Sequence, residues 1–253
     1  MPLMEERRNS ILEEVLKSGT ATVHDLANKF NVSYETIRKD LTYLESQKLL
    51  IKGHGGAIST QVNIENPFNV RSEENIELKQ KLVRRALSLI PEGSTVMLGT
   101  GSTVLELAKL LVVRDDLKVF TNSLPVATYL QSSNSESYLL GGKLRSKSSS
   151  VYGGWTETLL RKIQVSICFL GTDGFYNFNG PTSPSYSDAS IDSVILEQAR
   201  KKYILADATK FNRTSIYQIT DWNNITGLIT NKSANPELVS KIAQHTVVIP
   251  DEK

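Results

Sequence analysis

The sequence predicts an α/β protein of two domains. An N-terminal winged helix-turn-helix covers residues 1–58, a linker covers 59–70, and a doubly wound, mostly parallel α/β domain covers 71–253. Two observations predict this arrangement. The first domain places apolar side chains at helical spacing and ends in a glycine-rich turn, whereas the remainder alternates short strand-like apolar runs with helical patterns. The length of 253 residues accommodates a small domain and one of medium size.

Three helices are predicted in the first domain. Residues 5–17 carry one apolar side, and a second helix follows Thr22, a residue type that caps helix N-termini. A third helix follows Ser33 in the same way, after a connection short enough for a helix-turn-helix. The inward-facing stripe of this third helix consists of Ile37, Leu41 and Leu44.

The opposite face of the third helix is polar near its N-terminal half, where a recognition helix meets bases and phosphates in the major groove. A helix N-terminus also favours a bound phosphate. After it, a short strand at Leu49–Ile51 and the tight turn Lys52–Gly56 predict the hairpin of a wing. We therefore expect DNA contacts from Ser33, Tyr34, Thr36, Arg38, Lys39, Lys52 and His54.

Charge alone does not assign DNA binding to this domain. Residues 1–58 contain as many Lys and Arg as Asp and Glu, so a helical module with solvated charges, or one that contacts another protein, fits the composition equally well. The motif is more specific. VSYETIRKDLTYLE followed by HGGA closely resembles the DNA-binding signature of the DeoR family of bacterial transcriptional regulators. The resemblance implies that the first domain binds operator DNA.

The second domain is predicted to begin with a long helix at Arg71–Ile90. Further helical patterns are clearest at Thr103–Leu111, Asp188–Lys201 and Pro236–Gln244. Strands that alternate with helices form a mostly parallel sheet covered on both faces. The expected strands are Thr95–Leu98, Leu117–Thr121, Ser137–Leu140, Val165–Leu170, Tyr203–Ala206, Thr226–Ile229 and Thr246–Ile249.

Composition excludes several classes of protein. With 40% hydrophobic and 22% charged residues the chain has an ordinary soluble composition, and its net charge of +2 favours no particular partner. The sequence has neither 18 successive apolar residues nor a hydrophobic leader, so we expect a cytoplasmic protein without membrane contact. The lone Cys168 lies in an apolar run and is expected to be a buried thiol. Three scattered histidines give no metal-ligand spacing, and no cofactor is expected.

Ligands of doubly wound sheets bind outside the carboxyl ends of the strands, so the loops at those ends are the candidate sites. The loop of residues 99–103 lies directly between a strand and a helix, where amides, hydroxyls and the positive helix end form a cradle for phosphate. Each candidate loop alone also fits a capped turn or a solvated charge, but five of them at one end of a sheet indicate a ligand site. The candidates are Gly99, Thr100, Gly101, Ser102, Thr103, Asn122, Gly142, Lys143, Asp173, Asp207 and Lys210.

A second resemblance covers this domain. GTGST, TNSLPVA, LGGKLR, FLGTDGF, NGPTSP and ILADATKF stand in the order and spacing of the DeoR family's C-terminal effector domain, which is similar in fold to ribose-5-phosphate isomerase. The resemblance implies that residues 99–103 hold the phosphate of a phosphorylated sugar and that Asn122 and Asp173 face the sugar. It also implies that Lys210 faces an anionic or carbonyl group.

The sequence departs from the isomerase in ways that bear on catalysis. The enzyme's Asp-Gly-x-Asp pattern is Leu170-Gly171-Thr172-Asp173 here, and its lysine followed by glycines is missing around 177–187. Proton transfer at a sugar carbon needs a positioned base and groups that stabilise the enediolate, so we expect binding without turnover. From the regulator family the chain departs at Asp188 and Asp192, which stand where a Glu and a cation are common.

These observations predict a transcriptional regulator, namely a repressor of a carbohydrate-metabolism operon controlled by a phosphorylated sugar. The alternative is a sugar-phosphate isomerase with an accessory helical module. The expected partners are double-stranded operator DNA, the phosphorylated effector and further copies of the chain, as a dimer or tetramer.

Overall fold

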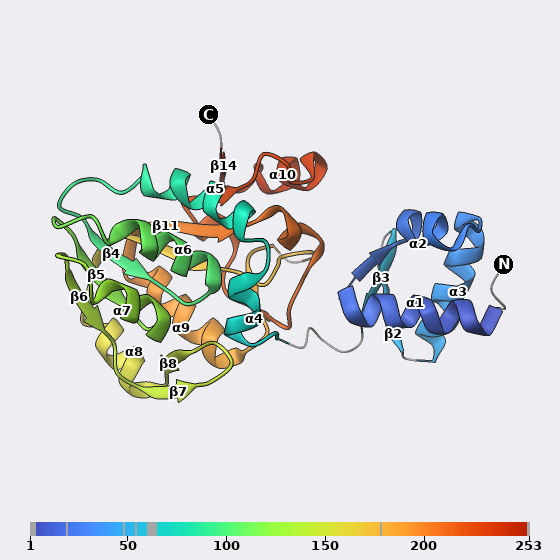
Figure 1. The fold of residues 1–253 in the computed structure, drawn as a ribbon, viewed down its shortest axis with the longest axis horizontal. Coiled ribbons are helices and arrows are strands. Elements are labelled where there is room, and N and C mark those ends of the chain that lie inside the picture. Colours follow the sequence, from blue (N-terminus) through green and yellow to red (C-terminus); the bar gives the residue numbers. More distant parts are fainter. Residues whose placement is uncertain are drawn as a thin grey trace. The chain divides into compact units, whose positions relative to one another are not determined.

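The computed structural model describes residues 4–18, 20–47, 49–53, 55–59, 65–177 and 179–251. The chain divides into two compact units, residues 1–64 and 65–253 (Figure 1). Each unit has an apolar core of its own.

The first unit is a winged helix-turn-helix. Its elements in chain order are α1 (Met4–Ser18), β1 (Thr20–Thr22), α2 (Val23–Phe30), α3 (Tyr34–Ser46), β2 (Leu50–Gly53) and β3 (Gly56–Ser59). The strands form an antiparallel sheet in the order β1-β3-β2, in which β2 and β3 are the predicted wing hairpin. Strand β1 was not predicted, because three residues are too few to show a period.

The helix boundaries of this unit follow from local side-chain chemistry. Thr22 Oγ1 accepts a hydrogen bond from the Asp25 amide at 3.0 Å, and Ser33 Oγ accepts one from the Thr36 amide at 3.2 Å, which confirms both predicted caps. Asn31 ends α2 in the left-handed conformation with φ of 52°. The predicted stripe of α3 is fully buried and consists of Ile37, Leu41 and Leu44.

The second unit is built on a seven-stranded sheet. Its strands are β4 (Thr95–Leu98), β5 (Lys118–Thr121), β6 (Glu136–Leu139), β9 (Val165–Gly171), β11 (Ala199–Ala206), β13 (Gly227–Thr230) and β14 (Val247–Pro250). They lie in the order β14-β13-β11-β9-β4-β5-β6, and every neighbouring pair is parallel. The predicted doubly wound parallel sheet is therefore confirmed, with all seven expected strands present.

Helices cover both faces of this sheet (Figure 1). They are α4 (Phe68–Glu73), α5 (Ile76–Leu87), α6 (Ser102–Leu111), α7 (Leu124–Leu130), α8 (Gly154–Leu160), α9 (Tyr186–Glu197) and α10 (Pro236–Ile242). Helices α5, α6 and α7 pack on the face that carries Val96 and Leu98, and α8 and α9 pack on the face that carries Met97. Cys168 belongs to the apolar core on the face that carries Met97, where burial raises the pKa of its thiol to about 12.

Shorter elements complete the second unit. An antiparallel hairpin joins β7 (Lys143–Arg145) to β8 (Ser150–Tyr152), and a two-residue ladder joins β10 (Thr182–Ser183) to β12 (Tyr217–Gln218). Two 3₁₀ turns, η1 (Ala208–Asn212) and η2 (Trp222–Asn224), follow β11 and β12.

Two predicted helices have different bounds in the structure. The helix expected at 71–90 is two helices, α4 and α5, separated where Asn75 adopts the left-handed conformation with φ of 52°. The helix expected at 188–201 ends at Glu197, because the chain enters β11 at Ala199 to pair with β9. Apolar spacing alone does not distinguish the last turn of a helix from the first residues of a buried strand.

The expected linker also differs from the structure over its second half. Residues 65–70 belong to the second unit, where α4 begins at Phe68. The Phe68 side chain is buried, and its amide donates a hydrogen bond to the Lys147 carbonyl at 3.0 Å. Residues 60–64 lie outside the described residues.

Candidate functional site

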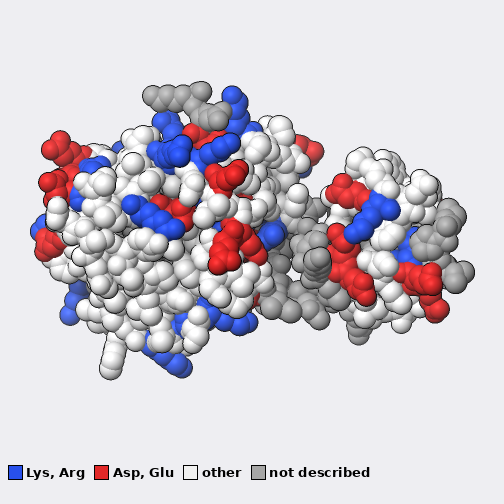
Figure 2. Space-filling view, viewed as in Figure 1, with Lys and Arg blue, Asp and Glu red and all other residues white. Residues whose placement is uncertain are grey.

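The first candidate surface is the outer face of α3. Tyr34, Arg38 and Lys39 are exposed there, as a helix that enters a DNA groove requires. Arg38 lies 3.8 Å from Glu35 in an exposed ion pair, which is weak enough to exchange for a phosphate. Among the visible side chains of the first unit, acidic and basic residues are interspersed (Figure 2).

The other residues expected on this surface are held by the protein to different degrees. Thr36 is half-buried, and its hydroxyl lies 2.9 Å from Ser33 Oγ, so both hydroxyls already serve the helix cap. Lys52 Nζ donates a hydrogen bond to Thr42 Oγ1 at 2.9 Å, which holds the wing lysine against α3. His54 lies outside the described residues.

A buried carboxylate on the inner face of α3 fixes this helix, and sequence reasoning missed it. Asp40 accepts from Arg7 Nε at 2.7 Å and from Arg8 Nε at 2.9 Å, so α1 and α3 are joined by two charge-assisted hydrogen bonds. The two arginines neutralise a carboxylate that is only 2% exposed. The orientation of α3 therefore depends on α1.

The second candidate site lies between the carboxyl ends of β4 and β9. From β4 the chain adds β5 and β6 on one side and β9, β11, β13 and β14 on the other, so β4 and β9 flank the point where the strand order reverses. Ligands of doubly wound folds bind at this point. A pocket of about 510 Å³, counting solvent at its mouth, opens here. Its lining residues are Glu65, Arg71, Thr100, Gly101, Ser102, Thr103, Ser148, Gly171, Thr172, Asp173, Thr182, Ser183, Asp188, Asp192, Lys210 and Ile219.

The N-terminus of α6 forms one wall of the pocket. Its N-cap is Gly101, and no side chain caps it, as is also the case for α4, α5 and α8. The first amides of a helix have no partner within the helix. Gly101 has a φ of 116°, which favours glycine, and Ser102 and Thr103 are buried beside it. This wall offers amides and hydroxyls to an anion.

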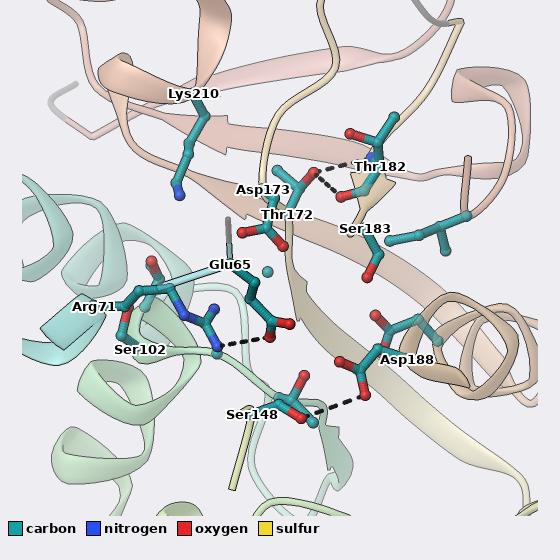
Figure 3. A pocket seen from close by; sticks show the side chains of 16 residues that line it. Glu65, Arg71, Ser102, Ser148, Thr172, Asp173, Thr182, Ser183, Asp188 and Lys210 are labelled. Carbon is teal, nitrogen blue, oxygen red and sulfur yellow. Dashed lines mark hydrogen bonds and ion pairs between the residues drawn. The ribbon is translucent and has the colours of Figure 1, made fainter. Parts of the chain in front are cut away.

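Two cations line the same pocket. Lys210, on η1, extends toward the cavity, and Arg71, on α4, lies beside Ser102 (Figure 3). Lys79 fixes the backbone of Arg71, because its Nζ donates hydrogen bonds to the carbonyls of Arg71 and Glu74 at 2.5 Å each. Burial lowers the pKa of Lys79 to about 8.

Carboxylates gather on the other side of the pocket. Asp188 receives an ion pair from Arg145 at 3.0 Å, yet burial raises the pKa of its carboxyl to about 6, against the attraction of Arg145. Asp192 is 7% exposed, and within the described ranges its carboxylate has no hydrogen-bond partner. Burial, followed by the charges of Asp188 and Asp173, raises the pKa of Asp192 well above its ordinary value.

Glu65 occupies the middle of this arrangement (Figure 3). Both of its oxygens accept from Arg145, one of them at 2.7 Å, and Oε1 lies 3.7 Å from Arg71. Its side chain is 5% exposed. Arg145 is therefore shared between Glu65 and Asp188. Neither Glu65 nor Arg145 is among the site residues predicted from the sequence, because the pair joins residues eighty positions apart.

Of the residues predicted for the ligand site, the pocket brings together Thr100, Gly101, Ser102, Thr103, Asp173 and Lys210. Gly99 lies behind it, where a Cβ would collide with the Leu170 side chain. Its role in the structure is to allow this close packing.

Four other predicted residues do not line the pocket. Asn122 is buried, and its Nδ2 donates to the Val151 carbonyl at 3.1 Å. Gly142 allows close packing against Thr156, and Lys143 is exposed on β7. Asp207 caps η1, because its Oδ1 accepts from the Thr209 amide at 3.0 Å rather than pairing with Lys210. Position after a strand predicted a role at the sheet edge for each, but not which way each would face.

Two further observations concern the described part of the chain as a whole. In those residues no three or more His, Cys, Asp or Glu side chains are placed to hold a metal ion. No helix formed by them has the length and apolar character needed to cross a bilayer.

The fold and the two surfaces define a class of protein, that of regulators that join a DNA-binding winged helix to a ligand-sensing α/β domain. Comparison with known proteins gives the family. Residues 7–62 match the family model described as the DeoR-like helix-turn-helix domain, and residues 74–232 match that of the DeoR C terminal sensor domain. The chain belongs to the DeoR family of DNA-binding transcriptional regulators.

Three curated relatives match the chain over nearly their whole length. The lactose phosphotransferase system repressor of Streptococcus mutans is 34% identical, covering 97% of this chain and 98% of the relative. The glycerol-3-phosphate regulon repressor of Escherichia coli is 26% identical, covering 96% of each, and the L-fucose operon activator of Haemophilus influenzae is 28% identical, covering 97% and 99%. These relatives are transcriptional regulators and not enzymes.

Among solved structures, ribose 5-phosphate isomerase A from Methanocaldococcus jannaschii is similar to the chain. It has 18% sequence identity and a TM-score of 0.41, and the match covers 55% of each chain. The translation initiation factor eIF-2B of Pyrococcus horikoshii has 19% identity and a TM-score of 0.42, with 61% and 62% covered.

Proposed function

We propose that the chain represses a carbohydrate-metabolism operon and that a phosphorylated sugar, bound in the pocket between β4 and β9, controls its operator binding. The observation that carries this proposal is the uncapped N-terminus of α6, which opens into a polar pocket beside Lys210 and Arg71. Free amides, a helix dipole and two cations suit a phosphate group.

The remainder of the pocket suits a polyhydroxylated body. Asp188 offers carboxylate oxygens, and Ser148 and Ser183 offer hydroxyls, on the side away from Lys210, and Asp173 offers a carboxylate between them and Lys210 (Figure 3). Carboxylates are strong acceptors for hydroxyl groups. The names of the relatives, which include regulators of lactose and glycerol-3-phosphate systems, support a sugar or related phosphate.

The DNA surface that we propose is the exposed face of α3 with the wing. Tyr34, Arg38 and Lys39 would contact bases and phosphates, and Lys52 would contact phosphate from the wing. We further propose that the regulator acts in the cytoplasm as a dimer or tetramer, because a symmetric operator needs two half-site readers.

The test is a thermal-shift panel of aldose and ketose phosphates, each compared with its unphosphorylated sugar. A ligand that binds the native state raises the melting temperature, so only phosphorylated members of the panel should stabilise the protein. Lys210→Met should lower the affinity for the ligand that stabilises the protein most by about tenfold, the typical effect of one lost charge-assisted hydrogen bond. Lys201→Met, at an exposed position near the start of β11, is the matched control.

The same ligand is then added to a gel-retardation assay with DNA from upstream of the protein's own gene. We expect the ligand to change the fraction of operator DNA that the protein binds. Equal stabilisation by the sugar and its phosphate, or an unaltered response in Lys210→Met, would count against the proposed phosphate cradle.

A further inference from the structure

Glu65 lies where the chain enters the second unit, and its carboxylate reaches into the pocket proposed for the effector. Its burial is unusual for a carboxylate that is not part of a helix or strand, since only 5% of the side chain is exposed. Both oxygens accept from Arg145, and one lies within ion-pair distance of Arg71. The pocket therefore contains an anion that belongs to the protein itself.

We infer that Glu65 is an internal competitor of the effector phosphate, and that the effector acts by displacing it. The inference rests on the proposed function, because it requires an anionic ligand in this pocket. Arg71 lies beside Ser102 at the start of α6, so a phosphate in the α6 cradle and the Glu65 carboxylate compete for the same guanidinium (Figure 3). A phosphate and a carboxylate that share one guanidinium also repel one another, and this repulsion is stronger in a partly buried site than in bulk water.

Arg145 makes the displacement reversible. It donates to Ser148 Oγ at 3.0 Å and pairs with Asp188 at 3.0 Å in addition to Glu65. When Glu65 leaves, Arg145 is still paired, so no uncompensated buried charge remains. Withdrawal of Glu65 also removes one of the negative charges that raise the pKa of Asp188. The free-energy cost of moving Glu65 out of the pocket is therefore small.

Displacement of Glu65 should also loosen the residues that follow it at the start of the second unit. Arg71 Nε donates to the Asn66 carbonyl at 3.0 Å, so a phosphate that recruits Arg71 also withdraws a contact from the residue after Glu65. The backbone carbonyl of Arg71 stays fixed, because it accepts a hydrogen bond from Lys79 Nζ. Residues 65–67 are thus the part that is released, together with the peptide bond that joins Pro67 to Phe68, and the buried side chain of Phe68 is where the release ends.

The experiment compares wild type with Glu65→Gln, using inorganic phosphate as the ligand and calorimetry to measure its affinity. Glutamine keeps the shape but not the charge, so Glu65→Gln should bind phosphate roughly tenfold more tightly, which is the expected size of one removed like charge nearby. Glu73→Gln removes the same charge from an exposed position on α4 and should bind phosphate as wild type does.

Amide hydrogen exchange supplies the second measurement, with the amides of Phe68 and Arg71 as reporters, since both are hydrogen-bonded in the structure. Phosphate should raise their exchange several-fold in wild type, and Glu65→Gln should show that raised exchange without phosphate. Glu65→Asp, which keeps the charge but shortens the reach to Arg145, should lie between the two and serves if the glutamine variant does not fold.

The inference requires both changes together. Tighter phosphate binding without faster exchange, or faster exchange with equal or weaker binding, overturns it and leaves Glu65 a structural residue. If neither wild type nor Glu65→Gln binds phosphate or any sugar phosphate, the proposed function fails with it. Phosphate binding that is equal in the two proteins overturns the displacement alone.

Discussion

Asp192 shows how a single carboxyl group in the pocket affects stability. It is buried on α9, it has no hydrogen-bond partner among the described residues, and Asp188 and Asp173 lie near enough to raise its pKa. The ionised form is therefore disfavoured in the native state but not in the unfolded chain. We predict that Asp192→Asn raises the free energy of unfolding by about 1–2 kcal/mol near neutral pH.

The pH dependence identifies the cause. Because the native pKa is raised, the native state binds more protons than the unfolded state above about pH 4, so stability falls as pH rises through the native pKa. The gain from Asp192→Asn should thus be large near pH 7.5 and small near pH 4.5, as measured by thermal unfolding at both values. Asp188, whose pKa is raised to about 6, contributes in the same direction between about pH 4 and pH 6. A gain that is independent of pH would contradict this account.

At the scale of a structural element, α3 separates a buried face that fixes it from an exposed face free to bind. Arg38 is exposed and weakly paired, so Arg38→Ala should leave the circular-dichroism spectrum and the melting temperature unchanged. Operator affinity should fall, and the slope of log affinity against log salt should decrease in magnitude by about 1 if Arg38 contacts a phosphate. Gel retardation at several salt concentrations measures both quantities.

Lys29→Ala provides the comparison for that variant. Lys29 is exposed at the end of α2 and pairs with Glu14 of α1 at 2.6 Å. Its removal should leave the salt slope as it is in wild type. An Arg38→Ala protein with wild-type affinity at every salt concentration would exclude Arg38 from the DNA surface.

At the scale of the whole molecule, the ligand and the operator must influence each other equally. If a sugar phosphate weakens operator binding by a given factor, operator DNA weakens sugar-phosphate binding by the same factor, because both are measures of one coupling free energy. We predict a factor of about 5–150, the range usual for such coupling. Calorimetry of the ligand with and without operator, and retardation of the operator with and without ligand, measure it from both directions. Unequal factors would mean that a third equilibrium, such as assembly of further copies, participates.

The sequence predicted features that depend on local periodicity and capping, and it failed where distant residues meet. Thr22 and Ser33 cap helices as expected, because capping involves residues three positions apart. Glu65 and Arg145 were not found, since neither carries a local signal of the other. For Asp207 and Asn122 the location after a strand was correct, but the backbone uses both side chains, and spacing does not reveal that demand.

The uncapped start of α6 also matters for anyone who wishes to redesign the molecule. Main-chain amides are common to nearly all amino acids, so exchanging side chains of the proposed cradle other than Lys210 and Arg71 should leave its affinity for an anion largely intact. If the proposed function holds, recognition of the rest of the ligand would depend instead on Asp173, Asp188 and Asp192, which line the same pocket. A combinatorial library restricted to those three codons is therefore the economical starting point for converting this scaffold into a biosensor for a different phosphorylated compound.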